Sequence, residues 1–170
     1  MFLHNRIAAS MLTEGLHYRK LRVLARMIFF RCEDPVRMPA VIGHFALARA
    51  EGRADQPGFE ELLALVRRGK AYVKLSGPYR ISKRSPDYDD IAPITRALVR
   101  AAPDRMLWGS NWPHTSGANR RTDQDPSVIE PFRFEDDGRN FNLVADWVPE
   151  AGLRSAILVD NPARAYGFTG

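Results

Sequence analysis

Side chains able to carry out chemistry follow three short apolar segments of this sequence. They include histidine, lysine, tyrosine, arginine and asparagine, which together offer a base, two cations and neutral hydrogen-bond donors. This combination suits the binding of an anionic molecule and the polarisation or attack of a carbonyl group on it. The candidate residues are His44, Lys74, Ser76, Tyr79, Arg80, Asn111 and His114.

His44 and Asn111 are the candidates for the catalytic step. A histidine can act as a general base or polarise a carbonyl group, so both roles are open for His44. Asn111 cannot accept a proton at neutral pH, but it can orient a water molecule or polarise a carbonyl through its NH2 group. The simpler explanations are a turn-forming asparagine and a histidine satisfied by local hydrogen bonds at a strand end.

Lys74, Tyr79 and Arg80 are the candidates for holding a substrate. Cationic and hydrogen-bonding groups near one strand end suit a carboxylated molecule, although a solvated loop explains them as well. Ser76 alternates with apolar residues in the same phase as Lys74, so the two share one face of a strand. His114 follows the last apolar segment, where it can contact a ligand or cap the next turn.

Parallel strands joined by helices would bring these positions together. Apolar residues spaced at i, i+3, i+4 and i+7 from Phe59 predict a helix between the first two apolar segments, and Gly69 is placed to end it. Strands alternating with helices predict an α/β fold with a parallel sheet, whose carboxyl ends bind ligands. The predicted strands are residues 39–45, 71–77 and 106–108; Asp55, Asp89 or Asp90, and Asp160 are predicted helix caps; and a long loop from Thr115 to about Arg139 precedes helices at 140–147 and around Leu153, Ile157 and Leu158.

Length and composition indicate one globular unit. The chain has 170 residues, of which 45% are hydrophobic and 26% charged, and no apolar run approaches the roughly 18 residues of a membrane span. A single cysteine, Cys32, excludes an internal disulfide framework and favours a reducing compartment, so a cytoplasmic protein is expected. Residues 1–40 carry seven Lys/Arg against three acids, which is +4 of the net charge of +5. The remainder is nearly neutral, which argues against a basic nucleic-acid binder.

Recognisable cofactor motifs are missing from the sequence. It contains no Gly-rich phosphate loop, no His-Glu-x-x-His and no His-x-His. His44 and His114 could meet at neighbouring strand ends, but nothing completes a metal-binding shell around them. The expectation is therefore that no cofactor is used, and a divalent metal such as zinc is the alternative.

Several of these segments resemble one protein family. The run Trp-Gly-Ser-Asn-Trp-Pro-His at residues 108–114 is similar to the last-strand signature of the metal-independent lactonase branch of the amidohydrolase superfamily, which includes the 2-pyrone-4,6-dicarboxylate hydrolases. Similar motifs occur in the right order from about residue 39 to the end. They are residues 41–45 (Val-Ile-Gly-His-Phe), 55–59 (Asp-Gln-Pro-Gly-Phe), 74–80 (Lys-Leu-Ser-Gly-Pro-Tyr-Arg), 160–164 (Asp-Asn-Pro-Ala-Arg) and 166–168 (Tyr-Gly-Phe).

The resemblance implies that residues 39–170 are the C-terminal half of an amidohydrolase-type (β/α)8 TIM barrel, preceded by a poorly matched segment, residues 1–38. It implies a hydrolase that opens a lactone, breaking an ester C–O bond in a carboxylated small molecule. In the same comparison His44 polarises the scissile carbonyl and Asn111 occupies the position that activates water. Arg80, with Lys74, Ser76 and Tyr79 nearby, corresponds to the residues that hold substrate carboxylates.

Three features depart from the family pattern. Gly43 stands where aspartate is usual, and Asn111 stands where well-studied members have aspartate. The first half of the barrel, with its His-x-His pair, has no counterpart in these 170 residues. Impaired hydrolysis by the isolated chain is therefore expected. The expected partner is a carboxylated small molecule rather than nucleic acid or membrane, and exposed barrel edges would allow a homo-oligomer.

Two other functions are open at this stage. One is a metal-dependent decarboxylase of the same superfamily, which would bind metal in stoichiometric amount. The other is a non-catalytic barrel remnant that acts through oligomerisation, with an exposed sheet edge pairing with another chain.

Overall fold

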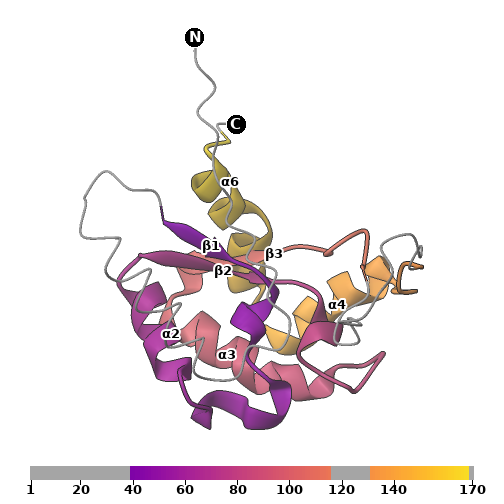
Figure 1. The fold of residues 1–170 in the computed structure, drawn as a ribbon. Helices are drawn as coiled ribbons and strands as arrows, with labels where there is room; N and C mark the ends of the chain where they lie inside the picture. Colours follow the sequence, from indigo (N-terminus) through magenta and orange to yellow (C-terminus); the bar gives the residue numbers. More distant parts are fainter. Residues whose placement is uncertain (1–38, 116–130, 169–170) are drawn as a thin grey trace, which may run out of the picture.

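The structure of the chain, a computed structural model, describes residues 39–115 and 131–168. The strands in this part of the chain are β1 (Ala40–Ile42), β2 (Ala71–Leu75) and β3 (Met106–Trp108). They are parallel and form one sheet with β2 in the centre (Figure 1). Val73 of β2 pairs with Ile42 on one side and with Met106 on the other. Residues 1–38, which the sequence comparison sets apart as a separate segment, lie outside the described residues.

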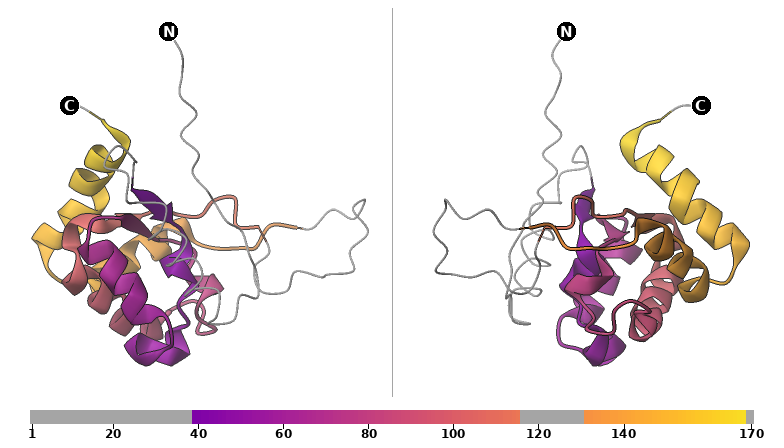
Figure 2. Two further views of the ribbon diagram at one scale, coloured as in Figure 1. Left: turned by 60° about the vertical axis from the view of Figure 1, so that its left-hand side comes forward. Right: turned by 90° about the vertical axis from the view of Figure 1, so that its right-hand side faces the viewer.

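Helical segments follow each strand, so the order of elements is the predicted α/β alternation. After β1 come η1 (His44–Leu47), η2 (Ala50–Asp55) and α2 (Phe59–Arg67); after β2 come η3 (Pro78–Arg80), η4 (Asp89–Ile91), α3 (Ala92–Ala101) and η5 (Pro103–Arg105); after β3 come α4 (Asp137–Trp147), α5 (Ala151–Ser155), the π-helical η6 (Ala156–Asp160) and α6 (Asn161–Tyr166). Figure 1 shows α2 and α3 side by side on one face of the sheet. Figure 2 shows the last three segments as one helical rod, which packs against β3. None of the helices in the described ranges is long and apolar enough to cross a lipid bilayer.

The core lies between the sheet and helices α2 and α3. The apolar stripe of α2 faces it as predicted, with Phe59 fully buried and Leu62, Leu63 and Val66 all less than a tenth exposed. Burying side chains of this size stabilises the fold by about 1.5–3 kcal/mol each. Gly69 follows the end of α2 with a φ of +67°, the left-handed conformation that closes a helix.

The strands are shorter than the apolar runs suggest. The sequence predicts strands over 39–45 and 71–77, but β1 ends at Ile42 and β2 at Leu75. The chain leaves the sheet because His44 and Gly77 take left-handed backbone conformations, with φ of +54° and +58°. A strand requires extended φ, so pairing cannot continue past these residues.

All three predicted helix caps are wrong. Asp89 and Asp90 lie inside η4, and the residue that precedes α3 is Ile91, which makes no side-chain capping hydrogen bond. Asp55 ends η2, and the residue that caps α2 is Gly58, with a φ of +86°. Asp160 has helical φ and ψ and makes no capping hydrogen bond, because the rod continues through it. Asp136, which the sequence places in a loop, does cap α4 through a hydrogen bond from the Arg139 amide at 2.9 Å, so this helix begins earlier than predicted.

The Asn161 side chain ties the C-terminal rod to the start of β3. It is 1% exposed, and its Nδ2 donates to the carbonyl oxygens of Pro103 and Met106, both at 2.8 Å. The motif Asp-Asn-Pro therefore acts through its asparagine, which satisfies two backbone acceptors at the entrance to a strand.

Candidate active site

A hydrogen-bonded chain of three side chains lies where the strands end. His44 follows β1, Tyr79 lies in η3 after β2, and Asn111 follows β3. The His44 Nε2 is 2.8 Å from the Asn111 Oδ1, and the Asn111 Nδ2 donates to the Tyr79 hydroxyl at 2.7 Å. The parallel sheet thus brings together residues that lie 67 and 32 positions apart in the sequence.

The backbone at and after His44 and at Asn111 adopts left-handed conformations that most residues avoid. His44 and Asn111 have φ of +54° and +71°, and the three residues after His44 are also left-handed. Each such residue costs about 1–2 kcal/mol relative to right-handed backbone. Residues held in this way concentrate at functional sites, where the surrounding packing maintains them.

Gly77 allows His44 and Asn111 to meet. A Cβ atom at this position would lie 2.9 Å from the Asn111 Nδ2 and 3.2 Å from the His44 Cδ2. Its φ of +58° also disfavours any other residue. Beside it, the Ser76 hydroxyl accepts a hydrogen bond from the backbone amide of His44 at 3.3 Å. The segment after β2 therefore shapes the contact between the other two strand ends.

His44 is held in its neutral form. Burial lowers its pKa below the ordinary value of 6.5, and the hydrogen bond to Asn111 opposes this shift. The positive charges of Arg80 and Lys74 lower the pKa further. An uncharged imidazole at neutral pH can accept a proton, which is the state required of a general base.

Two guanidinium groups lie against the Tyr79 ring. The guanidinium of Arg80 lies 5.7 Å from the ring centroid and that of Arg133 lies 4.6 Å from it. Arg133 is fixed at both ends, because its backbone amide donates to the His114 carbonyl at 2.9 Å and its side chain pairs with Glu135 at 3.3 Å. Arg80 therefore adds positive charge beside a phenol that contacts Asn111, whereas the charge of Arg133 is balanced by Glu135.

Arg133 and Glu135 are absent from the sequence-based candidates. They lie in the stretch between Thr115 and Arg139, which has no periodicity, and no local spacing connects them to Tyr79. Glu135 has a side chain only 6% exposed and also accepts from the Tyr88 hydroxyl at 3.1 Å. The signal available in the sequence was the alternation of charge and aromatic residues at 132–135, which is typical of an extended segment.

His114 joins the loop after β3 to helix α4. It is 5% exposed, its ring lies edge-on to Tyr79 with 5.9 Å between centroids, and its Nε2 is 3.0 Å from the Asp137 Oδ1. The two atoms lack good hydrogen-bond geometry, and the His114 Nδ1 has no hydrogen-bond partner among the described residues. His114 therefore lies beside the Tyr79 side of the site, with polar atoms still unsatisfied.

Lys74 lies in β2 and Ser76 directly follows this strand, and both side chains lie on the side next to Gly109, as their alternation predicts. A Cβ atom added to Gly109 would lie 3.1 Å from the Lys74 Cδ and 3.8 Å from the Ser76 Cβ, so both side chains pass next to the end of β3. Arg80 donates to the Thr115 hydroxyl at 3.3 Å, and its buried Nε has no partner in the part of the chain that the structure covers. All seven candidates thus lie at or beside the carboxyl ends of the strands.

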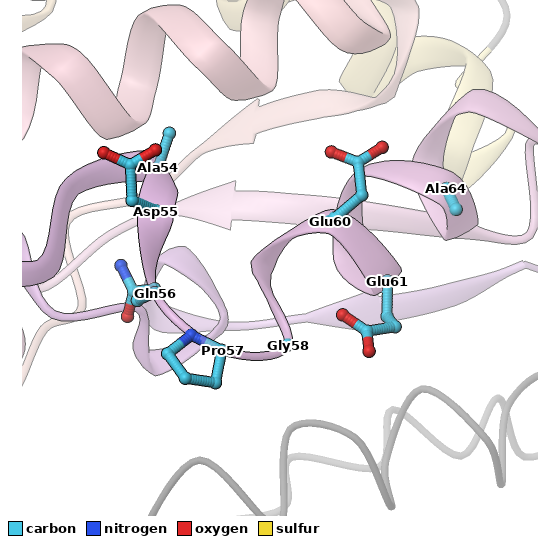
Figure 3. Close-up of a pocket in the computed structure, with 8 residues that line it drawn as sticks. All are labelled: Ala54, Asp55, Gln56, Pro57, Gly58, Glu60, Glu61 and Ala64. Carbon is cyan, nitrogen blue, oxygen red and sulfur yellow. The ribbon is translucent and has the colours of Figure 1, made fainter.

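A separate hollow lies at the start of α2 (Figure 3). It has a volume of about 570 Å³ and shares no lining residue with the His44 and Asn111 contact. The side chains drawn there include three carboxylates, so the hollow does not suit an anionic substrate. Its lining residues are Ala54, Asp55, Gln56, Pro57, Gly58, Glu60, Glu61 and Ala64.

The described residues do not assemble a metal centre. Nowhere in 39–115 and 131–168 do three or more His, Cys, Asp or Glu side chains converge to hold an ion. An amidohydrolase crystal structure from Burkholderia multivorans contains bound zinc; it is 23% identical to this chain, with a TM-score of 0.60 over 91% of this chain and 51% of that one. At that identity the likeness concerns the fold alone.

Curated relatives act on lactones. The chain is 39% identical over 130 residues to a 4-sulfomuconolactone hydrolase from Hydrogenophaga intermedia, a match of 76% of this chain and 39% of that protein. It is 36% identical over 114 residues to a D-galactarolactone isomerase from Agrobacterium fabrum, a match of 67% of this chain and 35% of that protein. The chain therefore spans less than half the length of these relatives.

A solved structure and a family profile agree with this result. The chain superposes on the crystal structure of a candidate 2-pyrone-4,6-dicarboxylic acid hydrolase from Pseudomonas putida with 31% identity and a TM-score of 0.62, over 86% of this chain and 50% of that one. The predicted fold, half of an amidohydrolase-type barrel, is confirmed by this coverage. The sequence profile of the amidohydrolase family matches residues 21–168. Because that match covers most of the chain, the protein belongs to the amidohydrolase family.

Proposed function

We propose that this chain carries the C-terminal catalytic part of a lactone hydrolase. The observation that supports it best is the contact between the His44 Nε2 and the Asn111 Oδ1, 2.8 Å apart at the carboxyl ends of two strands. A neutral histidine, an amide and a phenol, joined by hydrogen bonds, can transfer a proton and donate hydrogen bonds to a carbonyl group. Those are the functions needed to add water to a lactone and break its ring C–O bond.

The proposed substrate is a lactone that carries a carboxylate or a similar anion. Lys74 and Arg80 lie close enough to His44 to lower its pKa, and a bound anion would face the same charges. The related hydrolases are named for sulfonated and dicarboxylated lactones, which agrees with a cationic site. In this proposal His44 and Asn111 are catalytic, and the substrate is held by Lys74, Ser76, Tyr79, Arg80 and His114.

The experiment compares a charged lactone with an uncharged one. The purified chain is mixed with 2-pyrone-4,6-dicarboxylate or with unsubstituted 2-pyrone, and ring opening is followed by the loss of pyrone absorbance. Binding is measured by NMR chemical shifts as well, because the sequence predicts slow turnover by this chain alone. We expect the dicarboxylate to bind better, and any turnover to disappear in His44→Ala.

The matched variants are Arg80→Ala and Arg84→Ala. Arg84 is an exposed arginine a few residues further along, which pairs with Asp89. Loss of Arg80 should weaken binding of the dicarboxylate about tenfold, the effect of removing one charge-assisted hydrogen bond, whereas loss of Arg84 should have no effect. Equal losses in the two variants, or equal binding of the two pyrones, would contradict the proposal.

Product analysis separates hydrolysis from the other chemistry found among relatives. A hydrolase releases an open-chain acid (the keto acid formed from the enol, where the substrate is a 2-pyrone), an isomerase returns a second lactone, and a metal-dependent decarboxylase releases carbon dioxide. Repeating the assay with added zinc and with a chelator tests the metal alternative. Activity that appears only with zinc would favour the metal-dependent alternative over the metal-free mechanism.

The sheet edges favour a second proposal, association with another chain. Within the described residues β1 and β3 pair only with β2, and every residue of β1 is partly exposed. Unpaired strand edges bind other strands, so a homo-oligomer would cover them. Light scattering after size exclusion should then give a mass above that of one chain. A monomer with no tendency to associate at high concentration would rule this out.

A further inference from the structure

The hydrogen bonds of Asn111 have a direction. Its Oδ1 faces the His44 Nε2 and its Nδ2 faces the Tyr79 hydroxyl. An amide oxygen can only accept and an amide NH2 can only donate. The His44 Nε2 must therefore carry a hydrogen and donate it, and the Tyr79 oxygen must accept.

This direction leaves one reactive atom on each side of Asn111. A neutral imidazole has one ring hydrogen, and because it sits on Nε2, the Nδ1 of His44 retains its lone pair. The Tyr79 hydroxyl accepts from Asn111, and its own hydrogen has no acceptor in the part of the chain that the structure describes. The site thus offers a free base on His44 and a free O–H donor on Tyr79.

We propose that His44 takes the proton of the attacking water through Nδ1 and that Tyr79 donates its O–H to the lactone carbonyl oxygen. This inference rests on the proposed lactone hydrolysis, and it decides between the two roles that the sequence leaves open for His44. Asn111 is then a positioning residue, which fixes the tautomer of one partner and the orientation of the other.

The reaction balances with these groups alone. Water oxygen bonds to the carbonyl carbon, its proton moves to the His44 Nδ1, and the carbonyl electrons become an oxyanion that receives the Tyr79 hydrogen bond. The ring C–O bond then breaks, and the departing oxygen takes the proton back from His44. A lactone and water become a hydroxy acid, and where the lactone is a 2-pyrone the released enol tautomerises to a keto acid.

The surroundings of Tyr79 suit a developing negative charge. The guanidinium of Arg80 lies 5.7 Å from its ring centroid and supplies positive charge, and that of Arg133 lies 4.6 Å from the centroid as part of its ion pair with Glu135. Donors and positive charges preorganised around an oxyanion stabilise the transition state more than the ground state. His44, by contrast, is kept neutral by burial, so that it can accept a proton while Tyr79 donates a hydrogen bond.

The hydrogen-bond direction can be measured without turnover. The chain has four histidines, so ¹⁵N NMR of the imidazole rings is tractable, and the His44 signals are identified by their loss in His44→Gln. At pH 8 we expect His44 to show a protonated Nε2 and a pyridine-type Nδ1. A protonated Nδ1 would mean that Asn111 donates to His44 and that Tyr79 donates to Asn111, which overturns both roles.

Tyr79→Phe and Tyr72→Phe form a matched pair. Tyr72 is a buried phenol at the opposite end of β2, and its oxygen accepts from Arg105 at 2.8 Å. Where the chain hydrolyses 2-pyrone-4,6-dicarboxylate, Tyr79→Phe should lower kcat about 100-fold, the usual cost of losing one oxyanion donor, with KM little changed. Tyr72→Phe should leave kcat within about twofold.

The outcomes separate the inference from the proposed function. A Tyr79→Phe enzyme that loses affinity but keeps its kcat would return Tyr79 to substrate binding and refute its role as a carbonyl donor. A chain that neither binds nor hydrolyses any lactone would end the proposed function, while the tautomer of His44 would still support or overturn the assigned hydrogen-bond direction.

Discussion

The two ends of the sheet are built in different ways. At the amino end, polar side chains complete the hydrogen bonds of the backbone and of one another: Asn161 donates to two carbonyls, and Arg105 donates to the Tyr72 hydroxyl at 2.8 Å while covering its ring. At the carboxyl end, His44 and Asn111 have left-handed backbones, and buried atoms of Arg80 and His114 lack partners among the described residues. Among the described residues, the polar side chains named at the amino end have hydrogen-bond partners, whereas some of those at the carboxyl end do not.

This difference separates stability from function. Satisfied polar groups stabilise a fold, whereas unsatisfied donors and strained backbone cost free energy and persist where a ligand uses them. Changes at the amino end should therefore reduce stability and leave the chemistry of His44 intact. Changes at the carboxyl end should alter the chemistry of His44 and leave stability nearly unchanged. Where such a change disturbs the backbone, it should affect stability as well.

The largest loss of stability is expected for Asn161→Ala. The change leaves the Pro103 and Met106 carbonyls without their donor in a buried place, and an unsatisfied buried group costs about 1–3 kcal/mol. We expect the free energy of unfolding in urea to fall by about 3 kcal/mol. The control, Asn142→Ala, removes an exposed asparagine from α4 and should change it by less than about 0.5 kcal/mol.

The His44 tautomer should be unaffected by Asn161→Ala. Both residues adjoin the same sheet, so this result tests whether its amino and carboxyl ends are independent. If the imidazole signals of the folded variant changed as much as its stability, the two ends would be coupled and the distinction between them would be lost.

The next largest effect is expected for Gly77→Ala. The added Cβ meets Asn111 at 2.9 Å, and the backbone keeps a φ of +58° that alanine adopts with strain. We expect the free energy of unfolding to fall by about 2 kcal/mol and the hydrogen bond between His44 and Asn111 to break, as reported by a mixed His44 tautomer. This variant affects stability and the site together.

Gly43→Ala is the matched control for Gly77→Ala. Gly43 precedes His44 directly, but a Cβ there meets nothing within 4 Å, and its φ of −79° suits any residue. It should fold with unchanged stability and an unchanged tautomer. Equal damage from both substitutions would show that the region after β1 tolerates no change, rather than that Gly77 alone must be small.

Local patterns in the sequence predict much of this fold. The stripe from Phe59 to Val66 predicts α2 because burial of one helix face is a property of a few neighbouring residues. Alternation of strands and helices predicts the parallel sheet, and with it the meeting of His44 and Asn111. Strand ends are predicted less well, because the left-handed turn at His44 depends on packing that no nearby residue signals.

Contacts made by residues outside the periodic segments are not predicted. Arg133 reaches Tyr79 through an aromatic contact between segments more than fifty positions apart, and neither residue lies in a periodic pattern with the other. The direction of the hydrogen bonds through Asn111 is likewise invisible in the sequence, since it depends on which amide atom faces His44. The sequence identifies which residue types lie at a site, but the structure is needed to decide which of their atoms carry a proton.

The smallest expected effect is the contribution of His44 to stability at different pH. Because its pKa is lowered in the folded state, the unfolded chain binds a proton more readily as the pH falls below 6.5. Stability from this residue is therefore complete above pH 6.5 and is lost progressively as the pH falls below it. In His44→Gln this part of the pH dependence should be absent.

Thermal unfolding of the two proteins between pH 8 and pH 5 measures this difference. The wild-type protein should lose more stability on acidification than His44→Gln does, since all other titrating groups are shared. A wild-type protein that instead gained stability relative to the variant would have a His44 that is easier to protonate when folded. Such an imidazole would be protonated to a greater extent near neutral pH and would serve less well as the base, so this small effect bears directly on the assignment made at the carboxyl end.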